Sequence, residues 1–153
     1  MNKILIVDNE KRIRMLYVEE LKEEGYNVFS TSNYSGLMDI VKQHKPNLIV
    51  FDIRTGNVND LDLLQDIIKV YKNISIILCS GYMGFPSNMR SWIADFYVGK
   101  SSDLSKLKLK IKMALVNGVQ KQQKRLSFKN YESFQFTQEK TDSFLSERVS
   151  NAN

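Results

Sequence analysis

Short hydrophobic runs, each of strand length and rich in β-branched residues, recur along the chain. The clear runs cover residues 4–7, 48–51, 74–79 and 96–98, with a weaker candidate at 27–30. Apolar residues within the clear runs are nearly continuous instead of alternating with polar ones. This pattern is typical of strands in a parallel sheet, because helices cover both faces of such a sheet. The runs therefore predict a buried parallel sheet.

The stretches between the runs carry apolar residues at the spacing of amphipathic helices. Gly25 supplies a stop signal for the first helix, and Pro46 ends the second, because the residue before a proline disfavours helical geometry. The apolar stripes are Ile13, Leu16, Tyr17 and Leu21, then Leu37, Ile40 and Val41, and finally Leu64, Ile67, Ile68 and Tyr71. The alternation of strands and helices predicts an open, doubly wound α/β sheet.

Residues 107–113 read Leu-Lys-Leu-Lys-Ile-Lys-Met, and this strict alternation is by itself a strand signal. The wider window favours a helix with Asp103 as its cap. Its continuous helical stripe consists of Leu104, Leu107, Ile111, Ala114 and Leu115. A helix leaves a second apolar face, made of Leu109, Met113 and Val116. We expect this face either to pack under the tail of the chain or to contact a partner or a second copy.

The composition changes at about Asn117. Residues 117–153 are rich in Gln, Ser, Asn and Lys, lack proline and contain scattered aromatic residues. We expect the preceding helix to continue to about Leu126 and the rest to be a mostly disordered tail, with a short aromatic docking segment as the alternative. The chain thus divides into one domain over residues 1–116 and a helix extension with a polar tail over 117–153.

Length and composition exclude several classes of protein. With 153 residues, the chain has room for one domain of ordinary size. Its one cysteine, Cys79, cannot form an internal disulfide, and its one histidine, His44, cannot build a zinc site alone. No apolar run approaches the roughly 18 residues that a membrane helix needs. The first apolar stretch ends too early for a secretory signal, so we expect a cytoplasmic protein.

The net charge of +5 does not by itself argue for a nucleic-acid partner. A run without acidic residues lies between Asp103 and Glu132, and its basic residues include Lys106, Lys108, Lys110, Lys112, Lys121, Lys124 and Arg125. Such a run is usually a solvated helix face; weak contact with nucleic acid, an anionic membrane or an acidic partner is the alternative.

Polar residues stand where the predicted strands end, and in an open α/β sheet ligands bind beyond the carboxyl ends of the strands. These residues are Asp8, Asn9 and Glu10, then Asp52, Ser80 and Lys100. Carboxylates and an amide oxygen that converge on one crevice suit Mg²⁺. A carboxylate near that ion can attack a phosphoryl group, while a lysine and a hydroxyl neutralise and hydrogen-bond the transferred oxygens.

Over residues 3 to about 116 the chain resembles the receiver domain of response regulators in bacterial two-component signalling. The matching segments are Lys3-Ile-Leu-Ile-Val-Asp8, Pro46-Asn-Leu-Ile-Val-Phe-Asp52, Ile77-Leu-Cys-Ser80 and Ala94-Asp-Phe-Tyr-Val-Gly-Lys100. The resemblance implies a flavodoxin-like, five-stranded parallel sheet of order 2-1-3-4-5, flanked by five helices.

The resemblance also implies roles for individual residues. Asp52 is the phosphoacceptor, Lys100 pairs with the phosphoryl group, and Ser80 and Tyr97 form the switch that responds to it. The implied ligands of Mg²⁺ are Asp8, Asn9, Asp52 and the backbone carbonyl of Arg54. A histidine kinase or phosphotransfer protein would donate the phosphoryl group. Output to a protein target, or a homodimer, would use the fourth helix, fifth strand and fifth helix.

The chain departs from the family pattern at several positions. Asn9 stands where a second acid is usual, so the metal site lacks one formal charge. Ser101 replaces a proline, and we expect a trans peptide bond before it, because a non-proline cis bond costs about 2.5–4 kcal/mol. The segment after Asp52 lacks the usual Met-Pro and final glycine. Arg54 and Tyr82 would flank the phosphoryl group and shield it from water, which predicts slow self-dephosphorylation.

Two functions from different classes remain open. The chain is either a phospho-accepting receiver or a degenerate receiver that acts as an interaction module without phosphorylation. Intact Asp8, Asp52, Ser80 and Lys100 favour the first function. Asn9, Ser101 and the altered loop after Asp52 favour the second. In neither case do we expect a conventional enzyme, since the chain at most catalyses its own phosphorylation and slow dephosphorylation. No Gly-x-Gly-x-x-Gly or phosphate-loop motif follows any predicted strand.

The substitution Asn9→Asp should tighten Mg²⁺ binding several-fold, because a second carboxylate restores the missing charge of the metal site. Calorimetric titration of Mg²⁺ into both proteins measures the difference. Equal affinities would show that position 9 does not limit metal binding.

Overall fold

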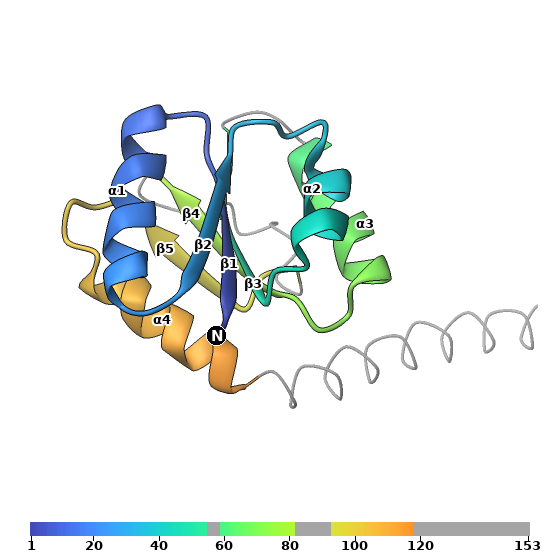
Figure 1. Ribbon diagram of the computed structural model, residues 1–153. Helices are drawn as coiled ribbons and strands as arrows, with labels where there is room; N and C mark the ends of the chain where they lie inside the picture. Colours follow the sequence, from blue (N-terminus) through green and yellow to red (C-terminus); the bar gives the residue numbers. More distant parts are fainter. Residues whose placement is uncertain (55–58, 82–92, 118–153) are drawn as a thin grey trace, which may run out of the picture. The chain divides into compact units, whose positions relative to one another are not determined.

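The computed structural model describes residues 1–54, 59–81 and 93–117 of the chain. Its five strands pair in parallel in the order β2-β1-β3-β4-β5, which confirms the predicted sheet (Figure 1). The strands are β1 (Lys3–Val7), β2 (Asn27–Thr31), β3 (Leu48–Asp52), β4 (Ser75–Ser80) and β5 (Phe96–Gly99). The weak run at 27–30 is therefore a true strand, at one edge of the sheet.

Four helices lie within the described residues: α1 (Lys11–Glu23), α2 (Leu37–His44), α3 (Asn59–Val70) and α4 (Ser105–Val116). The label α4 thus denotes the helix that the family resemblance counts as the fifth. The segment where a further helix is predicted, between β4 and β5, includes residues 82–92, which lie outside the described residues. The expected continuation of α4 to Leu126 also lies outside them.

The helices cover both faces of the sheet, α1 and α4 on one face and α2 and α3 on the other (Figure 1). Side chains alternate across a strand, so each strand supplies residues to both layers. Ile4 and Ile6 of β1 pack under α1 and α4, whereas Leu5 and Val7 pack under α2 and α3. Burial on both faces explains why the runs are continuously apolar.

Residues 105–116 form a helix, which confirms the helix that the wider window predicts in place of an alternating strand. Leu104, Leu107, Ile111 and Ala114 are buried against the sheet. Asp103 lies one residue before the N-cap position, which Leu104 occupies. Its carboxylate accepts hydrogen bonds from the backbone N–H of Ser105 at 2.9 Å and from the Ser105 hydroxyl at 2.6 Å. Asp103 therefore stabilises the start of the helix, although it lies one position before the N-cap instead of at it.

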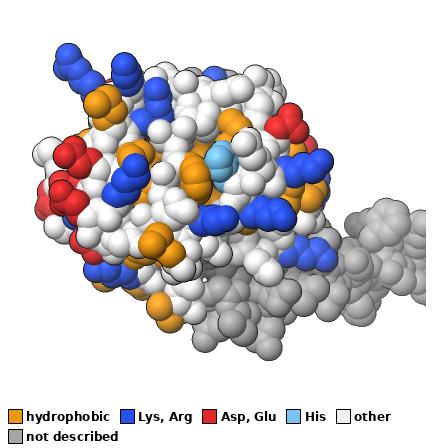
Figure 2. Space-filling model, in the orientation of Figure 1, with side chains coloured by type: hydrophobic (Ala, Val, Ile, Leu, Met, Phe, Trp, Pro, Cys, Tyr) orange, Lys and Arg blue, Asp and Glu red, His pale blue; other side chains and the backbone are white. Residues whose placement is uncertain are grey.

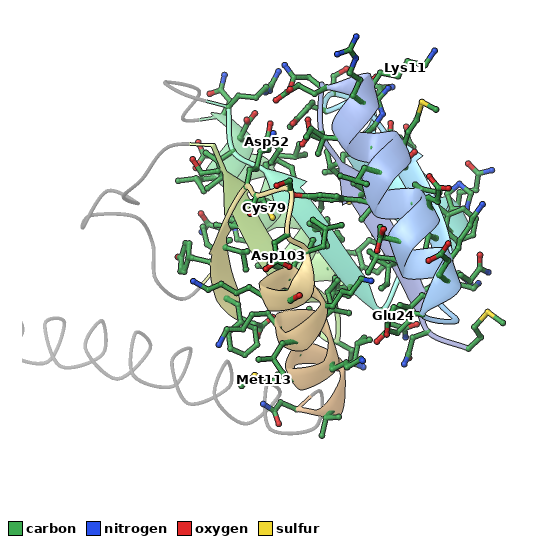
Figure 3. The ribbon with its side chains drawn as sticks, turned by 90° about the vertical axis from the view of Figure 1, so that its left-hand side faces the viewer. Lys11, Glu24, Asp52, Cys79, Asp103 and Met113 are labelled. Atoms are coloured by element: carbon green, nitrogen blue, oxygen red, sulfur yellow. The ribbon has the colours of Figure 1, made fainter. Side chains whose placement is uncertain are left out.

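The second apolar face of α4 is exposed. The exposed fractions are 56% for Leu109, 37% for Met113 and 81% for Val116. Figure 3 shows Met113 near the carboxyl-terminal end of α4. Packing under the tail and contact with a partner both remain predictions.

Part of the basic run is paired with acidic residues in α1 and at its C-cap. The Lys108 ammonium lies 2.7 Å from the Glu20 carboxylate and 3.4 Å from that of Glu24, and Lys112 lies 3.1 Å from Glu24. On the face shown in Figure 2, acidic side chains gather over α1, and lysine and arginine side chains are scattered among others. These ion pairs join α1 to α4 beside the sheet. None of the helices that the structure describes is long and apolar enough to cross a membrane.

Two helix ends use the left-handed backbone region. After α1, Gly25 has φ +87°; its N–H donates to the Lys22 carbonyl and the N–H of Tyr26 donates to the Leu21 carbonyl. These two bonds form a Schellman cap. After α2, Lys45 has φ 50° and ψ 61°, although it carries a side chain.

The substitution Gly25→Ala should lower the free energy of unfolding by about 1–2 kcal/mol. A β-carbon at this position would have no atom within 4 Å, so the cost is conformational and not steric. Lys45→Gly is the matched control of opposite sign. It should raise the free energy of unfolding by about 0.5 kcal/mol, because relief of the left-handed strain exceeds the added chain entropy of glycine. Denaturant unfolding measures both effects, and a loss of stability in Lys45→Gly would show that the left-handed backbone at this position carries no strain.

Candidate functional site

The strand register brings the polar strand ends together at the carboxyl edge of the sheet. Val7 pairs with Phe51, so Asp8 and Asp52 follow neighbouring strands side by side. Asp52 in turn pairs with Cys79 of β4, and Figure 3 shows the two labelled side chains at this end of the sheet. Lys100 directly follows β5, and its backbone N–H donates to the Ser80 carbonyl at 2.8 Å.

The ammonium group of Lys100 bridges two buried carboxylates. It lies 2.8 Å from Asp8 Oδ2 and 3.0 Å from Asp52 Oδ1, and only 2% of Asp8 and 7% of Asp52 is exposed. A third contact, of 3.2 Å, reaches the exposed carboxylate of Glu10. Buried carboxylates are stable in the ionised form only when a cation and hydrogen bonds compensate them. The lysine supplies that compensation in the structure.

Backbone contacts fix the orientation of Asp8. Its Oδ1 atom accepts a hydrogen bond from the backbone N–H of Glu10 at 2.8 Å, which leaves Oδ2 for the lysine. The guanidinium of Arg14, one turn into α1, donates to the backbone carbonyl of Asp8 at 2.7 Å. Sequence reasoning placed Glu10 at this edge but missed Arg14. Its position one turn after the acidic segment was the one available signal.

Burial changes the pKa values of several groups at this edge. Desolvation raises the pKa of Asp52, and the hydrogen bond from Lys100 opposes this shift only in part. Burial works against the charged form of Lys100, but hydrogen bonds to Asp8 and Asp52 outweigh it and raise the pKa of the lysine. Burial also raises the pKa of Cys79 to about 12, so this thiol is neutral beside the acids.

The donor set at this edge suits a small divalent cation. Asp8 and Asp52 offer carboxylate oxygens on either side of a position of positive charge, and oxygen ligands are those that Mg²⁺ prefers. Asn9 directly follows Asp8 and is exposed. No group of three or more His, Cys, Asp or Glu side chains in the described ranges is placed to hold a metal ion. A complete site therefore also needs backbone, amide or water oxygens.

Two further predicted site residues, Ser80 and Tyr97, lie within the described part of the chain. Ser80 is the last residue of β4 and is half-buried. Tyr97 of β5 is also half-buried and packs against the layer of α2 and α3, and burial raises its pKa. Tyr82 lies outside the described residues. The described ranges contain no cis peptide bond, as predicted for the bond before Ser101.

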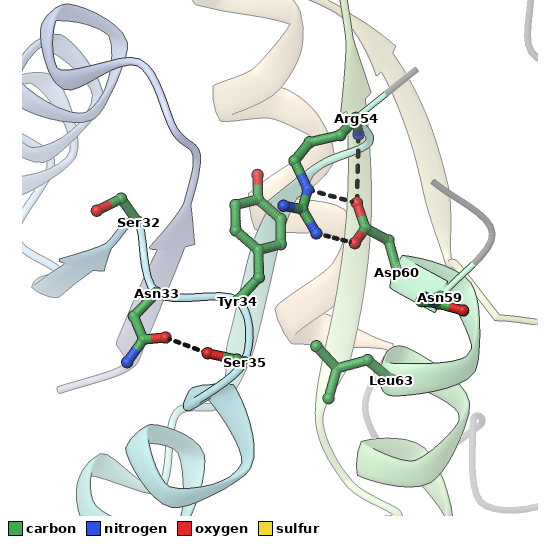
Figure 4. Close-up of a pocket in the computed structure, with 8 residues that line it drawn as sticks. All are labelled: Ser32, Asn33, Tyr34, Ser35, Arg54, Asn59, Asp60 and Leu63. Carbon is green, nitrogen blue, oxygen red and sulfur yellow. Dashed lines mark hydrogen bonds and ion pairs between the residues drawn. The ribbon is translucent and has the colours of Figure 1, made fainter. Parts of the chain in front are cut away.

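Arg54 lies two residues after the end of β3 and faces a pocket between the loop after β2 and the start of α3 (Figure 4). Its guanidinium forms an ion pair with Asp60 and lies over the Tyr34 ring, with 3.8 Å from Cζ to the ring centroid. The Tyr34 hydroxyl donates to the backbone carbonyl of Asp52 at 3.1 Å. Sequence reasoning identified neither Tyr34 nor Asp60. The missing glycine after Asp52 was a weak sign that this segment differs.

Fold and site together define a receiver-type signalling domain. The family model of the response regulator receiver domain matches residues 4–112, and the chain belongs to this family.

Among the curated relatives, the sporulation initiation phosphotransferase F of Bacillus subtilis is 32% identical over 80 residues, which are 52% of this chain and 64% of that protein. The chemotaxis protein CheY of Thermotoga maritima is 30% identical over 51% of this chain and 66% of its own length. The matches thus span just under two thirds of the length of these relatives.

Among solved structures, the response regulator TrrA of Thermotoga maritima, in complex with Mg²⁺ and BeF, is 36% identical with a TM-score of 0.68. That match covers 75% of this chain and all of TrrA. A second structure, of TrrA in complex with the histidine kinase ThkA, is 37% identical with a TM-score of 0.67, over 75% of this chain and 99% of the matched one.

The substitution Asp52→Asn should raise the free energy of unfolding at neutral pH by about 1 kcal/mol in metal-free buffer. The folded-state pKa of Asp52 is raised, so the wild type gains stability as pH falls through that pKa and lacks this gain at neutral pH. The amide keeps an acceptor for Lys100 but removes the buried charge.

Denaturant unfolding of both proteins in EDTA, from neutral pH down to the ordinary pKa of aspartate, measures this difference. The difference in the free energy of unfolding between the two proteins should become smaller as pH falls. A variant that is less stable than the wild type at neutral pH would contradict the upward shift of the Asp52 pKa.

Proposed function

We propose that this protein is a phospho-accepting receiver of a two-component system or phosphorelay, phosphorylated on Asp52. The observation that carries the proposal is the Lys100 ammonium bonded to both Asp8 and Asp52 at the carboxyl edge of the sheet. Two buried acids of unequal surroundings and one lysine are the groups that phosphoryl transfer to a carboxylate requires.

In the proposed reaction an oxygen of the Asp52 carboxylate attacks the phosphorus of the donor. A new O–P bond forms as the bond between phosphorus and the donor nitrogen or oxygen breaks, and the electron pair leaves with the donor. Lys100 moves its hydrogen bond from Asp52 to a phosphoryl oxygen and neutralises its charge. Asp8 keeps its hydrogen bonds from Lys100 and from the backbone N–H of Glu10.

Mg²⁺, when bound by Asp8, Asp52, Asn9 and the Arg54 carbonyl, supplies positive charge to the phosphoryl oxygens. The Ser80 hydroxyl then hydrogen-bonds the acylphosphate, and Tyr97 responds by moving further inward. As the family resemblance implies, Arg54 and Tyr82 would flank the phosphoryl group. Their bulk slows hydrolysis by limiting the approach of water.

We further propose that the receiver domain covers residues 1–116 and that the protein acts in the cytoplasm. A histidine kinase or phosphotransfer protein donates the phosphoryl group, in keeping with the kinase complex of TrrA. The output is contact with a downstream protein or a second copy through the surface of β5 and α4. The chain catalyses no reaction beyond its own phosphorylation and slow dephosphorylation.

The direct test is incubation with Mg²⁺ and a small-molecule phosphodonor, followed by intact-mass measurement. The wild type should gain the mass of one phosphoryl group, and Asp52→Asn should gain none. Asp8→Asn should react at least about tenfold more slowly, because a metal ligand is lost. EDTA should abolish the reaction in every protein.

Asp66→Asn is the matched control, since its carboxylate is exposed on α3 and pairs only weakly with Lys69. It should react like the wild type. A wild type that binds Mg²⁺ but takes up no phosphoryl group, from the small donor or from a histidine kinase, would reject the proposal in favour of a phosphorylation-independent interaction module.

A further inference from the structure

Asp60, the second residue of α3, is a buried carboxylate that binds Arg54. Only 1% of Asp60 is exposed. Its Oδ2 accepts hydrogen bonds from Arg54 Nε at 2.9 Å and from the Arg54 backbone N–H at 3.4 Å, and its Oδ1 is paired with Arg54 Nη2 (Figure 4). The carboxylate therefore holds both the side chain and the backbone of residue 54.

A second contact joins this pair to the acceptor strand. The Arg54 guanidinium lies on the Tyr34 ring, and the Tyr34 hydroxyl donates to the Asp52 backbone carbonyl. Tyr34 is itself buried, and its ring meets Phe51 edge to face at 5.3 Å. Asp60, Arg54 and Tyr34 thus fix the backbone on both sides of Ile53.

The chemistry of the pair makes this arrangement specific. A buried carboxylate that loses its partner is strongly destabilised, so Asp60 keeps the two-pronged guanidinium in place. Lysine cannot replace this geometry, because its ammonium has no planar fork. Asp60 stands in the segment that lacks the final glycine usual in the family pattern.

We propose that Asp60 is a positioning residue for the Mg²⁺ site, acting through Arg54 and Tyr34. The inference rests on the proposed function, in which the Asp52 carboxylate and the Arg54 carbonyl both ligate the ion. Mg²⁺ demands near-ideal octahedral geometry, so its affinity depends on how rigidly these two oxygens are held. Asp60 touches neither the metal nor the phosphoryl group.

The test is calorimetric titration of Mg²⁺ alone into the full chain and its variants. Asp60→Asn should weaken Mg²⁺ binding about tenfold. Tyr34→Phe and Arg54→Lys, which leave the net charge unchanged, should also weaken it. The double variant Asp60→Asn with Arg54→Lys should be no weaker than the weaker single variant, because both substitutions break the same contact.

Two controls separate positioning from charge and from stability. Asp62→Asn removes one exposed negative charge from the same helical turn, so it should change Mg²⁺ affinity less than about twofold. Ile67→Val removes a methyl group from the buried face of α3 and should lower stability with unchanged Mg²⁺ affinity. If Asp60→Asn does not fold, Tyr34→Phe and Arg54→Lys decide the question.

The outcomes distinguish this inference from the function on which it rests. A wild type without Mg²⁺ affinity would overturn both. A wild type that binds Mg²⁺, with Asp60→Asn no weaker than Asp62→Asn, would overturn the positioning role alone. Additive losses in the double variant would also overturn it, because Asp60 would then not act through Arg54.

Discussion

The ammonium group of Lys100 compensates two buried carboxylates at the carboxyl edge of the sheet, and the arrangement of the site depends on it. Asp8 and Asp52 follow adjacent strands, and both are almost fully buried. Two carboxylates in such a place repel each other and lose hydration, so they stay ionised only beside a cation. Lys100 provides it from the end of β5, two strands away from Asp52 in the sheet. The order of the strands is therefore what makes the site possible.

The surroundings of the two acids differ, and the difference suits their proposed roles. Asp8 receives a backbone N–H as well as the lysine, and Arg14 holds its carbonyl. Asp52 has a raised pKa, since desolvation exceeds the effect of Lys100. An acid that is held ionised against its surroundings is a better nucleophile towards phosphorus than one that is fully compensated. Under the proposed function, this incompletely compensated charge would make the Asp52 carboxylate reactive towards phosphorus.

The sequence predicted the layers and the meeting of three polar strand ends because these depend on short, local patterns. Continuous apolar runs identified the strands, helical stripes identified the helices, and polar residues at strand ends identified Asp8, Asp52 and Lys100. The helix at 105–116 required the wider window, since its alternating lysines imitate a strand. In each of these cases the signal lies within the element itself.

The contacts around Arg54 could not be predicted in the same way. Tyr34 lies in the loop after β2, and Asp60 lies in the first turn of α3. Both contact Arg54 only when the sheet and α3 are packed together. Arg14 reaches Asp8 through a side-chain rotamer that no pattern specifies. Such contacts depend on the geometry of loops. The absence of a glycine at one position does not predict that geometry.

The most direct measurement is a double-mutant cycle of stability between Lys100 and Asp52 in metal-free buffer at neutral pH. Lys100→Met should be markedly destabilising in the wild type and less so beside Asp52→Asn, with a coupling energy of about 1–3 kcal/mol. The exposed pair Asp66 and Lys69 should give only about 0.2–0.5 kcal/mol in the same experiment. A coupling between Lys100 and Asp52 no larger than that of the exposed pair would contradict the central role of the lysine.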